Sequence, residues 1–75
     1  MTAEMNGIEK ARRQMLLTQE GAAAIAGVSL VTYNRKENDP SKMTLGEFVS
    51  LYREYDDYAR DSMLSWLVSE CNAAA

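Results

Sequence analysis

The segment TQEGAAAIAGVSLVTYNRKEN, residues 18–38, constrains the fold most strongly because it holds two helix starts with one glycine between them. Thr18 and Ser29 are good N-cap residues, since a side-chain hydroxyl accepts a hydrogen bond from the unpaired backbone N–H groups of a first helical turn. Gly27 reaches the left-handed conformation at little cost and therefore ends a helix. The pattern predicts helices over residues 19–26 and 30 to about 37, joined by a very short turn.

Two helices joined so tightly cross steeply, and a small side chain is needed where they touch. Ala23, four residues before Gly27, supplies that small side chain. The other side chains of this segment that can face inward are Ile25, Ala26, Val28 and Tyr33. This is the helix-turn-helix arrangement, in which one face of the second helix projects from the domain and can enter the major groove of DNA.

Helical spacing continues on both sides of this segment. An Asn6–Glu9 pair resembles a capping box, so we expect the first helix to begin near residue 7. Its apolar face consists of Met5, Ile8, Ala11, Met15 and Leu16. A full capping box, Thr44 with Glu47, places the start of another helix at Leu45. The apolar stripe of this later helix consists of Leu45, Phe48, Val49, Tyr52 and Tyr55.

The C-terminal part leaves two alternatives open. Either an aspartate at Asp56–Asp57 caps a fifth helix over about 57–71, or the fourth helix continues to about residue 70. We favour the break, because these two aspartates are the polar interruption between the two apolar patterns. The expected fold is therefore all-α: a small four- or five-helix bundle with a helix-turn-helix, forming one domain over residues 1–75.

The composition argues against several functions. The chain has no histidine and one cysteine, which together cannot build a tetrahedral zinc site or supply the commonest general base. We expect no enzyme, no metal and no cofactor. A single cysteine, Cys71, makes a reducing cytoplasm the default location. We see no signal peptide, and no apolar stretch approaches the length of about 20 residues that a membrane span needs.

The charge is unevenly distributed along the chain. The net charge is −3, but residues 8–36 hold five basic and two acidic residues, a net of +3. Residues 44–75 hold two basic and six acidic residues, a net of −4. Because the local field steers a polyanion to a surface, the basic N-terminal half can bind DNA despite the acidic total.

The same residues carry a resemblance to a known family. Residues 18–38 resemble the helix-turn-helix of phage repressor and Cro-type proteins, often called the XRE family, and Ile8 with Ala11, Arg12 and Arg13 resembles its first helix. The residues in register are Thr18, Gln19, Glu20, Ala23, Gly27, Val28, Ser29, Arg35, Glu37 and Asn38. The likeness covers about residues 8–55. The chain departs from the family pattern at Gly21, Ala22, Lys36 and Asp39.

The resemblance implies sequence-specific binding of double-stranded DNA by a small transcriptional regulator, such as a repressor of a phage or mobile element. The residues it implies for base contacts are Ser29, Leu30, Val31, Asn34 and Arg35. Arginine pairs with guanine, asparagine with adenine, and aliphatic side chains pack on thymine methyl groups. The candidates for phosphate contacts are Lys10, Arg13, Gln19, Lys36 and Lys42.

The C-terminal segment is more apolar than one face of a terminal helix needs. We expect Met63, Trp66 and Leu67 to lie in a homodimer interface, which would set two reading helices about 34 Å apart. The alternative is packing of this helix onto the first helix within one chain, and both can hold together.

A second class of function remains open. The chain can be a protein-interaction module, such as an antirepressor or the partner of a regulator, that keeps the fold without reading DNA. The acidic C-terminal half and the apolar pair Leu30–Val31 favour this alternative, whereas Gln19, Arg35 and the Arg12–Arg13 cluster favour DNA binding.

Overall fold

Each predicted helix start is present in the computed structural model, which describes residues 6–73. These residues form an all-α fold of five α-helices and one short 3₁₀ helix. The elements in chain order are α1 (Gly7–Gln14), α2 (Gln19–Ala26), α3 (Leu30–Asn38), η1 (Pro40–Lys42), α4 (Leu45–Glu54) and α5 (Asp57–Ala73). The described part of the chain contains no helix that is long and apolar enough to cross a bilayer.

The caps explain why the helices begin where they do. Asn6, Thr18 and Ser29 each accept a backbone hydrogen bond from the residue three positions on, and Thr44 and Glu47 form the complete capping box. Gly27 ends α2 in the left-handed conformation with a φ of 76°. The preferred break between α4 and α5 is confirmed, since Asp56 Oδ1 accepts a hydrogen bond of 2.9 Å from the backbone N–H of Ala59.

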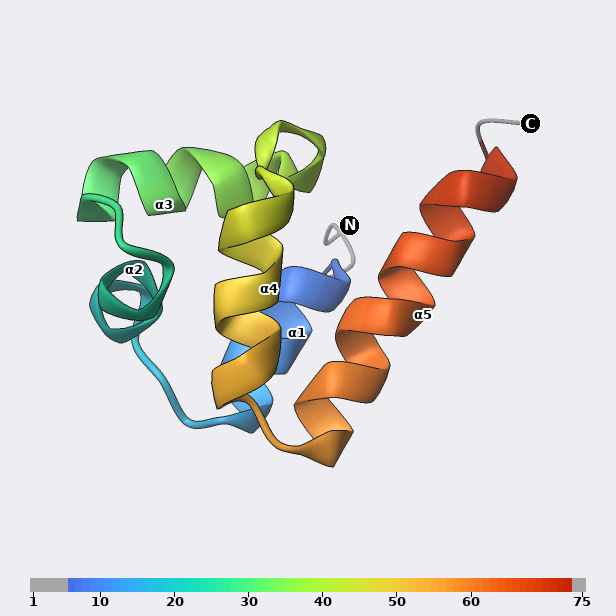
Figure 1. Ribbon diagram of the computed structural model, residues 1–75, viewed down its shortest axis with the longest axis horizontal. Helices are drawn as coiled ribbons and strands as arrows, with labels where there is room; N and C mark the ends of the chain where they lie inside the picture. Colours follow the sequence, from blue (N-terminus) through green and yellow to red (C-terminus); the bar gives the residue numbers. More distant parts are fainter. Residues whose placement is uncertain (1–5, 74–75) are drawn as a thin grey trace, which may run out of the picture.

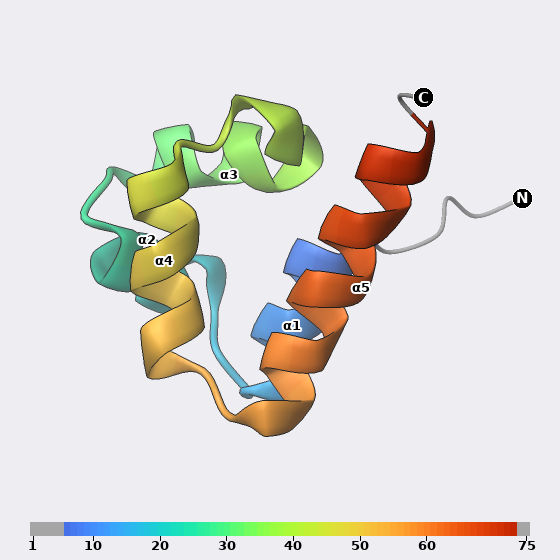
Figure 2. The same ribbon diagram turned by 45° about the vertical axis from the view of Figure 1, so that its right-hand side comes forward.

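The helices form two packed groups that share one core. α3 lies across one end of the molecule with α2 beneath its N-terminal end, and α4 packs against α2 (Figure 1). α5 packs mainly against α1, and its contact with α4 is much smaller. Figure 2 shows that the C-terminal half of α5 stands well away from α4. The outer face of α3 and the far end of α5 are therefore separate surfaces.

The core is built from small and large side chains of every α-helix. Its fully buried members are Ile8, Ala11, Ala22, Ala23, Tyr33, Leu51, Tyr55, Ala59 and Met63. Ala23 is 3% exposed, as expected for a residue at a close helix crossing. Ala22 has no exposed surface at all.

Some predicted core positions are wrong. Leu16 is 92% exposed, because the chain turns sharply after α1 and gives this residue a φ of 59°. Leu17 is the residue that packs against the core instead. Leu45 and Val49 are also exposed, and Leu45 lines an open groove that reaches Trp66 and Leu67 of α5. Met5 lies outside the described residues.

Gly7 sets the distance between α1 and α5. A Cβ atom at this position would collide with the carbonyl oxygen of Ser62 and with Cβ of Trp66. The oxygen belongs to backbone, so the collision can be relieved only if the two helices move apart. The absence of a side chain at Gly7 is therefore a packing requirement of the largest helix–helix contact in the fold.

We predict that Gly7→Ala destabilises the protein by about 1–3 kcal/mol, the usual cost of overpacking. Gly46→Ala is the matched control, because Gly46 lies in the exposed first turn of α4 and the nearest atom to its added Cβ would be 3.9 Å away. This control gains up to about 1 kcal/mol from helix propensity. Urea denaturation measures the free energy of unfolding of both variants. Equal midpoints for the two would contradict the close approach of α1 and α5 at Gly7.

Candidate nucleic-acid interface

A buried ion pair joins α1 to α3. Arg12 Nε lies 2.7 Å from Glu37 Oε2, and Arg12 Nη2 donates to Glu37 Oε1 at 3.1 Å. The two side chains are 10% and 3% exposed. This two-bond geometry is the strongest that arginine makes with a carboxylate. It holds the C-terminal turn of α3 against the last turn of α1.

Further hydrogen bonds support both members of the pair. Glu37 accepts hydrogen bonds from the hydroxyl of Tyr33 at 2.7 Å and from Gln19 Nε2 at 3.0 Å. Arg12 donates a further bond to the carbonyl oxygen of Leu17. Burial by itself would raise the pKa of Glu37, but the hydrogen bonds from Arg12, Gln19 and Tyr33 outweigh it and lower that pKa below its ordinary value. Glu37 is therefore a carboxylate at neutral pH.

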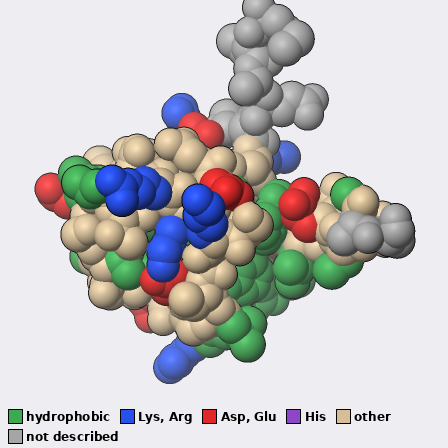
Figure 3. Space-filling view, turned by 90° about the horizontal axis from the view of Figure 1, so that it is seen from above, with side chains coloured by type: hydrophobic (Ala, Val, Ile, Leu, Met, Phe, Trp, Pro, Cys, Tyr) green, Lys and Arg blue, Asp and Glu red, His purple; other side chains and the backbone are tan. Residues whose placement is uncertain are grey.

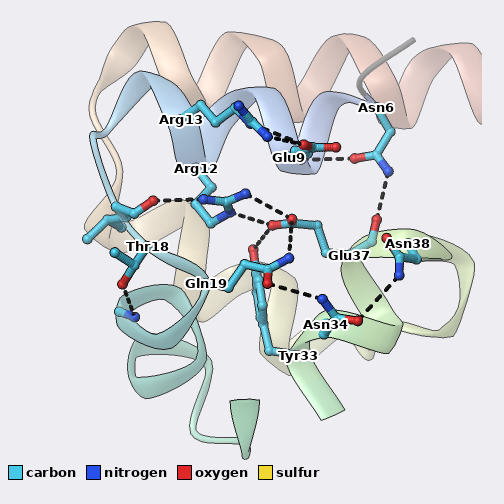
Figure 4. Close-up of polar contacts among 12 residues, drawn as sticks. Asn6, Glu9, Arg12, Arg13, Thr18, Gln19, Tyr33, Asn34, Glu37 and Asn38 are labelled. Carbon is cyan, nitrogen blue, oxygen red and sulfur yellow. Dashed lines mark hydrogen bonds and ion pairs between the residues drawn. The ribbon is translucent and has the colours of Figure 1, made fainter. Parts of the chain in front are cut away.

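The network extends to the start of α2. Asn34 Nδ2 donates to Gln19 Oε1 at 3.1 Å, so one glutamine amide bonds both Asn34 and Glu37 of α3 (Figure 4). Asn6 donates to the backbone carbonyl of Glu37, which ties the N-cap of α1 to the same helix. The first turn of α2 and the body of α3 are thus held in a fixed relation by side-chain bonds as well as by the short turn at Gly27.

This network decides which charges α3 presents to solvent. Glu37 is the only acidic residue of α3, and its carboxylate points inward. Val31 and Arg35, four residues apart and thus on one strip of the helix, are exposed. Leu30 is exposed in the first turn. The outer face of α3 therefore carries aliphatic groups and one guanidinium, with no carboxylate of its own.

Basic residues extend from α3 toward η1. A shallow depression is lined by Thr32, Arg35, Lys36, Asn38 and Lys42. Figure 3 views the molecule from the side of α3 and shows basic side chains gathered on this face, with some carboxylates among them. Lys36 Nζ donates to both carboxylate oxygens of Glu47. Arg35 and Lys42 form no ion pair with any residue between 6 and 73.

The predicted phosphate-contacting residues do not all lie on this face. Lys10 lines a different depression, between α1 and α5, together with Asp61 and Trp66. Arg13 forms an ion pair with Glu9 on α1. Lys36 is held by Glu47, and its side chain is 20% exposed. Of the three lysines predicted to contact phosphate, Lys42 is the one that lies near Arg35 and forms no ion pair within residues 6–73.

Side-chain contacts inside the protein change one predicted role and restrict another. Asn34 donates one amide hydrogen to Gln19 and accepts a weak bond from Asn38, which leaves its second amide hydrogen free, so its contact with adenine stays a prediction. Arg12, counted with Arg13 as a basic surface cluster, is buried against Glu37. Gln19 keeps the predicted place at the start of α2, but one of its amide hydrogens is bound to Glu37.

The predicted interface at α5 also changes. Met63 is fully buried in the core of a single chain, so it is not an interface residue. Trp66 is partly buried and packs against the same core. Leu67 is exposed, and the neighbouring Leu64 and Val68 are exposed with it, so the contact of Leu67 with a second copy stays a prediction.

The sequence does not predict the ion pair itself. It places Arg12 in a basic surface cluster and Glu37 only in the helix-turn-helix pattern. One signal was present: Tyr33 and Glu37 lie four residues apart, so a buried Tyr33 brings Glu37 to the same inward face. A buried carboxylate needs a cation, but the sequence does not say which of the basic residues supplies it.

Comparison of the chain with protein-family models, curated proteins and solved structures finds no match. Residues 6–73 contain no cluster of histidine, cysteine and acidic side chains that could hold a metal ion.

We predict that Glu37→Gln destabilises the fold by about 3–5 kcal/mol, because it leaves the charge of Arg12 buried without a partner. Glu9→Gln removes the same charge from the exposed pair with Arg13 and is expected to cost at most about 1 kcal/mol. Chemical denaturation of the two variants tests this difference. Similar losses from both would mean that the Arg12–Glu37 pair is not buried in solution.

Proposed function

We propose that this protein binds double-stranded DNA through the outer face of α3, as a small transcriptional regulator of the repressor and Cro type. The observation that carries the proposal is the inward position of Glu37. Its pairing with Arg12 removes the only carboxylate of α3 from a surface that would otherwise repel phosphate. Val31 and Arg35 remain on that surface and are of the right size and chemistry to reach base edges in a major groove.

The relation of α2 to α3 supports the same proposal. In a helix-turn-helix, the first helix crosses the DNA backbone and the N-terminal part of the second contacts bases. The hydrogen bonds from Gln19 to Glu37 and from Asn34 to Gln19 hold these two elements rigidly together. Lys42, near the other end of α3, lines a depression with Arg35 and is suited to contact a phosphate.

Regulators of this kind commonly bind as dimers, and the apolar surface of α5 is suited to pairing with a second copy. A hydrophobic groove between α4 and α5 is lined by Met43, Leu45, Phe48, Trp66 and Leu67. Leu64 and Val68 add exposed apolar surface on α5 itself. Isologous pairing at this end of the molecule would repeat the α3 face about once per DNA turn.

One observation favours the alternative function, a protein-interaction module: several basic side chains are already bound to carboxylates of the same chain. Of the eight basic residues, Arg12, Arg13, Lys36 and Arg60 form ion pairs. Fewer unpaired cations therefore face a phosphate backbone than the sequence suggests. Under this alternative, the exposed Leu30 and Val31 would contact a protein.

A selection from random duplexes, followed by binding measurements on variants, separates the two functions. We predict that Arg35→Ala weakens binding to the selected site by about 1–3 kcal/mol and relaxes preference at one base pair. Lys42→Ala should weaken all sequences about equally and reduce the salt dependence by about one phosphate contact. Lys10→Ala is the matched control, because it removes the same charge from a face between α1 and α5.

Equal losses from Lys42→Ala and Lys10→Ala would mean that α3 does not define the binding face. Failure to enrich any duplex, with capture of a protein partner that Val31→Ser abolishes, would replace DNA binding with the interaction module.

The dimer is tested separately with Leu67→Ser/Val68→Ser. Both side chains are exposed, so we predict a variant with unchanged helical content that sediments as a monomer at concentrations where the parent chain is a dimer. Its binding to a two-fold symmetric site should be much weaker, whereas binding to a half-site should be unchanged. A parent chain that remains monomeric at high micromolar concentration would contradict the dimer.

A further inference from the structure

An ion pair joins α3 to α4 beside the basic face. Lys36 Nζ donates to the two carboxylate oxygens of Glu47, at 2.7 and 2.6 Å. The two side chains are 20% and 13% exposed, so the pair is largely shielded from water. Dissolved salt screens a shielded pair much less than an exposed one. The pair therefore persists at moderate ionic strength.

The carboxylate of Glu47 is held in place independently of Lys36. Its Oε1 atom accepts a hydrogen bond of 2.8 Å from the backbone N–H of Thr44, and the Thr44 hydroxyl accepts one from the backbone N–H of Glu47. These two bonds are the capping box that starts α4. Hydrogen bonds from Lys36 and Thr44 lower the pKa of Glu47 below its ordinary value, so it is ionised at neutral pH. The capping box thus presents a fixed anion to a flexible lysine side chain.

The pair engages one of three cations in the shallow depression beside α3. Arg35, Lys36 and Lys42 line this depression, and of these only Lys36 forms an ion pair within residues 6–73. The pair does not support a major packing contact, because α3 packs mainly against α2 and η1. Its main effect is therefore electrostatic: the protein itself neutralises an ammonium group that lies beside the basic face.

We propose, on the basis of the DNA-binding function above, that Glu47 is an internal competitor of DNA phosphate. Its carboxylate occupies Lys36, so the outer face of α3 binds the phosphate backbone with one cation fewer than it carries. Phosphate contacts contain no direct sequence information. Glu47 therefore lowers the affinity for every duplex by the same factor and leaves the preference among sites unchanged.

Glu47→Gln tests the proposal, because glutamine keeps the side-chain acceptor of the capping box and removes the negative charge. Binding is measured with a labelled duplex of mixed sequence and with a site selected from random duplexes. We expect tighter binding of both by the same factor. Since one phosphate contact has a salt slope of about 0.9, this gain should fall about three- to fourfold between 50 and 200 mM salt.

Two further variants identify the group that is released. Glu54→Gln is the matched control, because Glu54 is an exposed residue at the other end of α4 and its replacement changes the net charge by the same amount. Lys36→Gln/Glu47→Gln keeps the net charge of the parent chain, and it should return the affinity and the salt dependence to the parent values. Circular dichroism melting establishes that each variant is folded.

The outcomes separate this inference from the proposed function. A gain in Glu47→Gln no larger than that in Glu54→Gln overturns the competitor, because net charge alone then explains it. A gain that persists in the double variant also overturns it, since Glu47 then acts without Lys36. Both results leave DNA binding in place. Failure of every variant to bind any duplex overturns the DNA-binding function itself, and this inference with it.

Discussion

The buried pair of Arg12 and Glu37 is the interaction on which the arrangement of the other helices depends. It joins the first helix to the C-terminal turn of the third, and through Gln19 it fixes the start of the second. Removing two charges from water is expensive, and the cost is offset only when the remaining donors and acceptors are satisfied. Here the hydroxyl of Tyr33 and the carbonyl of Leu17 supply further hydrogen bonds to the pair.

The pair also has an electrostatic consequence at the surface. The last turn of α3 contains Arg35, Lys36 and Glu37, and it would expose charges of both signs if all three side chains pointed outward. The fold instead buries Glu37 and pairs Lys36 with Glu47 of α4, so Arg35 is the charge left on the outer strip. The same contacts that stabilise the motif therefore simplify the chemistry of its outer face. The Glu47 carboxylate, which binds Lys36, reduces the positive charge of this face.

A second structural feature is the divergence of α5 from α4. Close contact at Gly7 holds α5 against α1, and beyond this contact the helix moves away from the body of the molecule. Its apolar residues consequently divide into two groups. Met63 belongs to the core, Leu64, Leu67 and Val68 remain exposed, and Trp66 lies at the boundary. This geometry explains why the segment carries more apolar residues than one chain buries.

The sequence by itself determined the all-α class, the helix starts and the turn of the helix-turn-helix. These features are local: a cap such as Thr18 needs only the next three residues, and Gly27 needs only its own backbone freedom. Tertiary structure decided which side chains remain available for binding. Arg12, Asn34 and Lys36 are of residue types that usually lie on the surface. Each forms a hydrogen bond with a residue between 11 and 25 positions away in the sequence. Such contacts depend on how the helices pack, and periodicity within one helix does not report them.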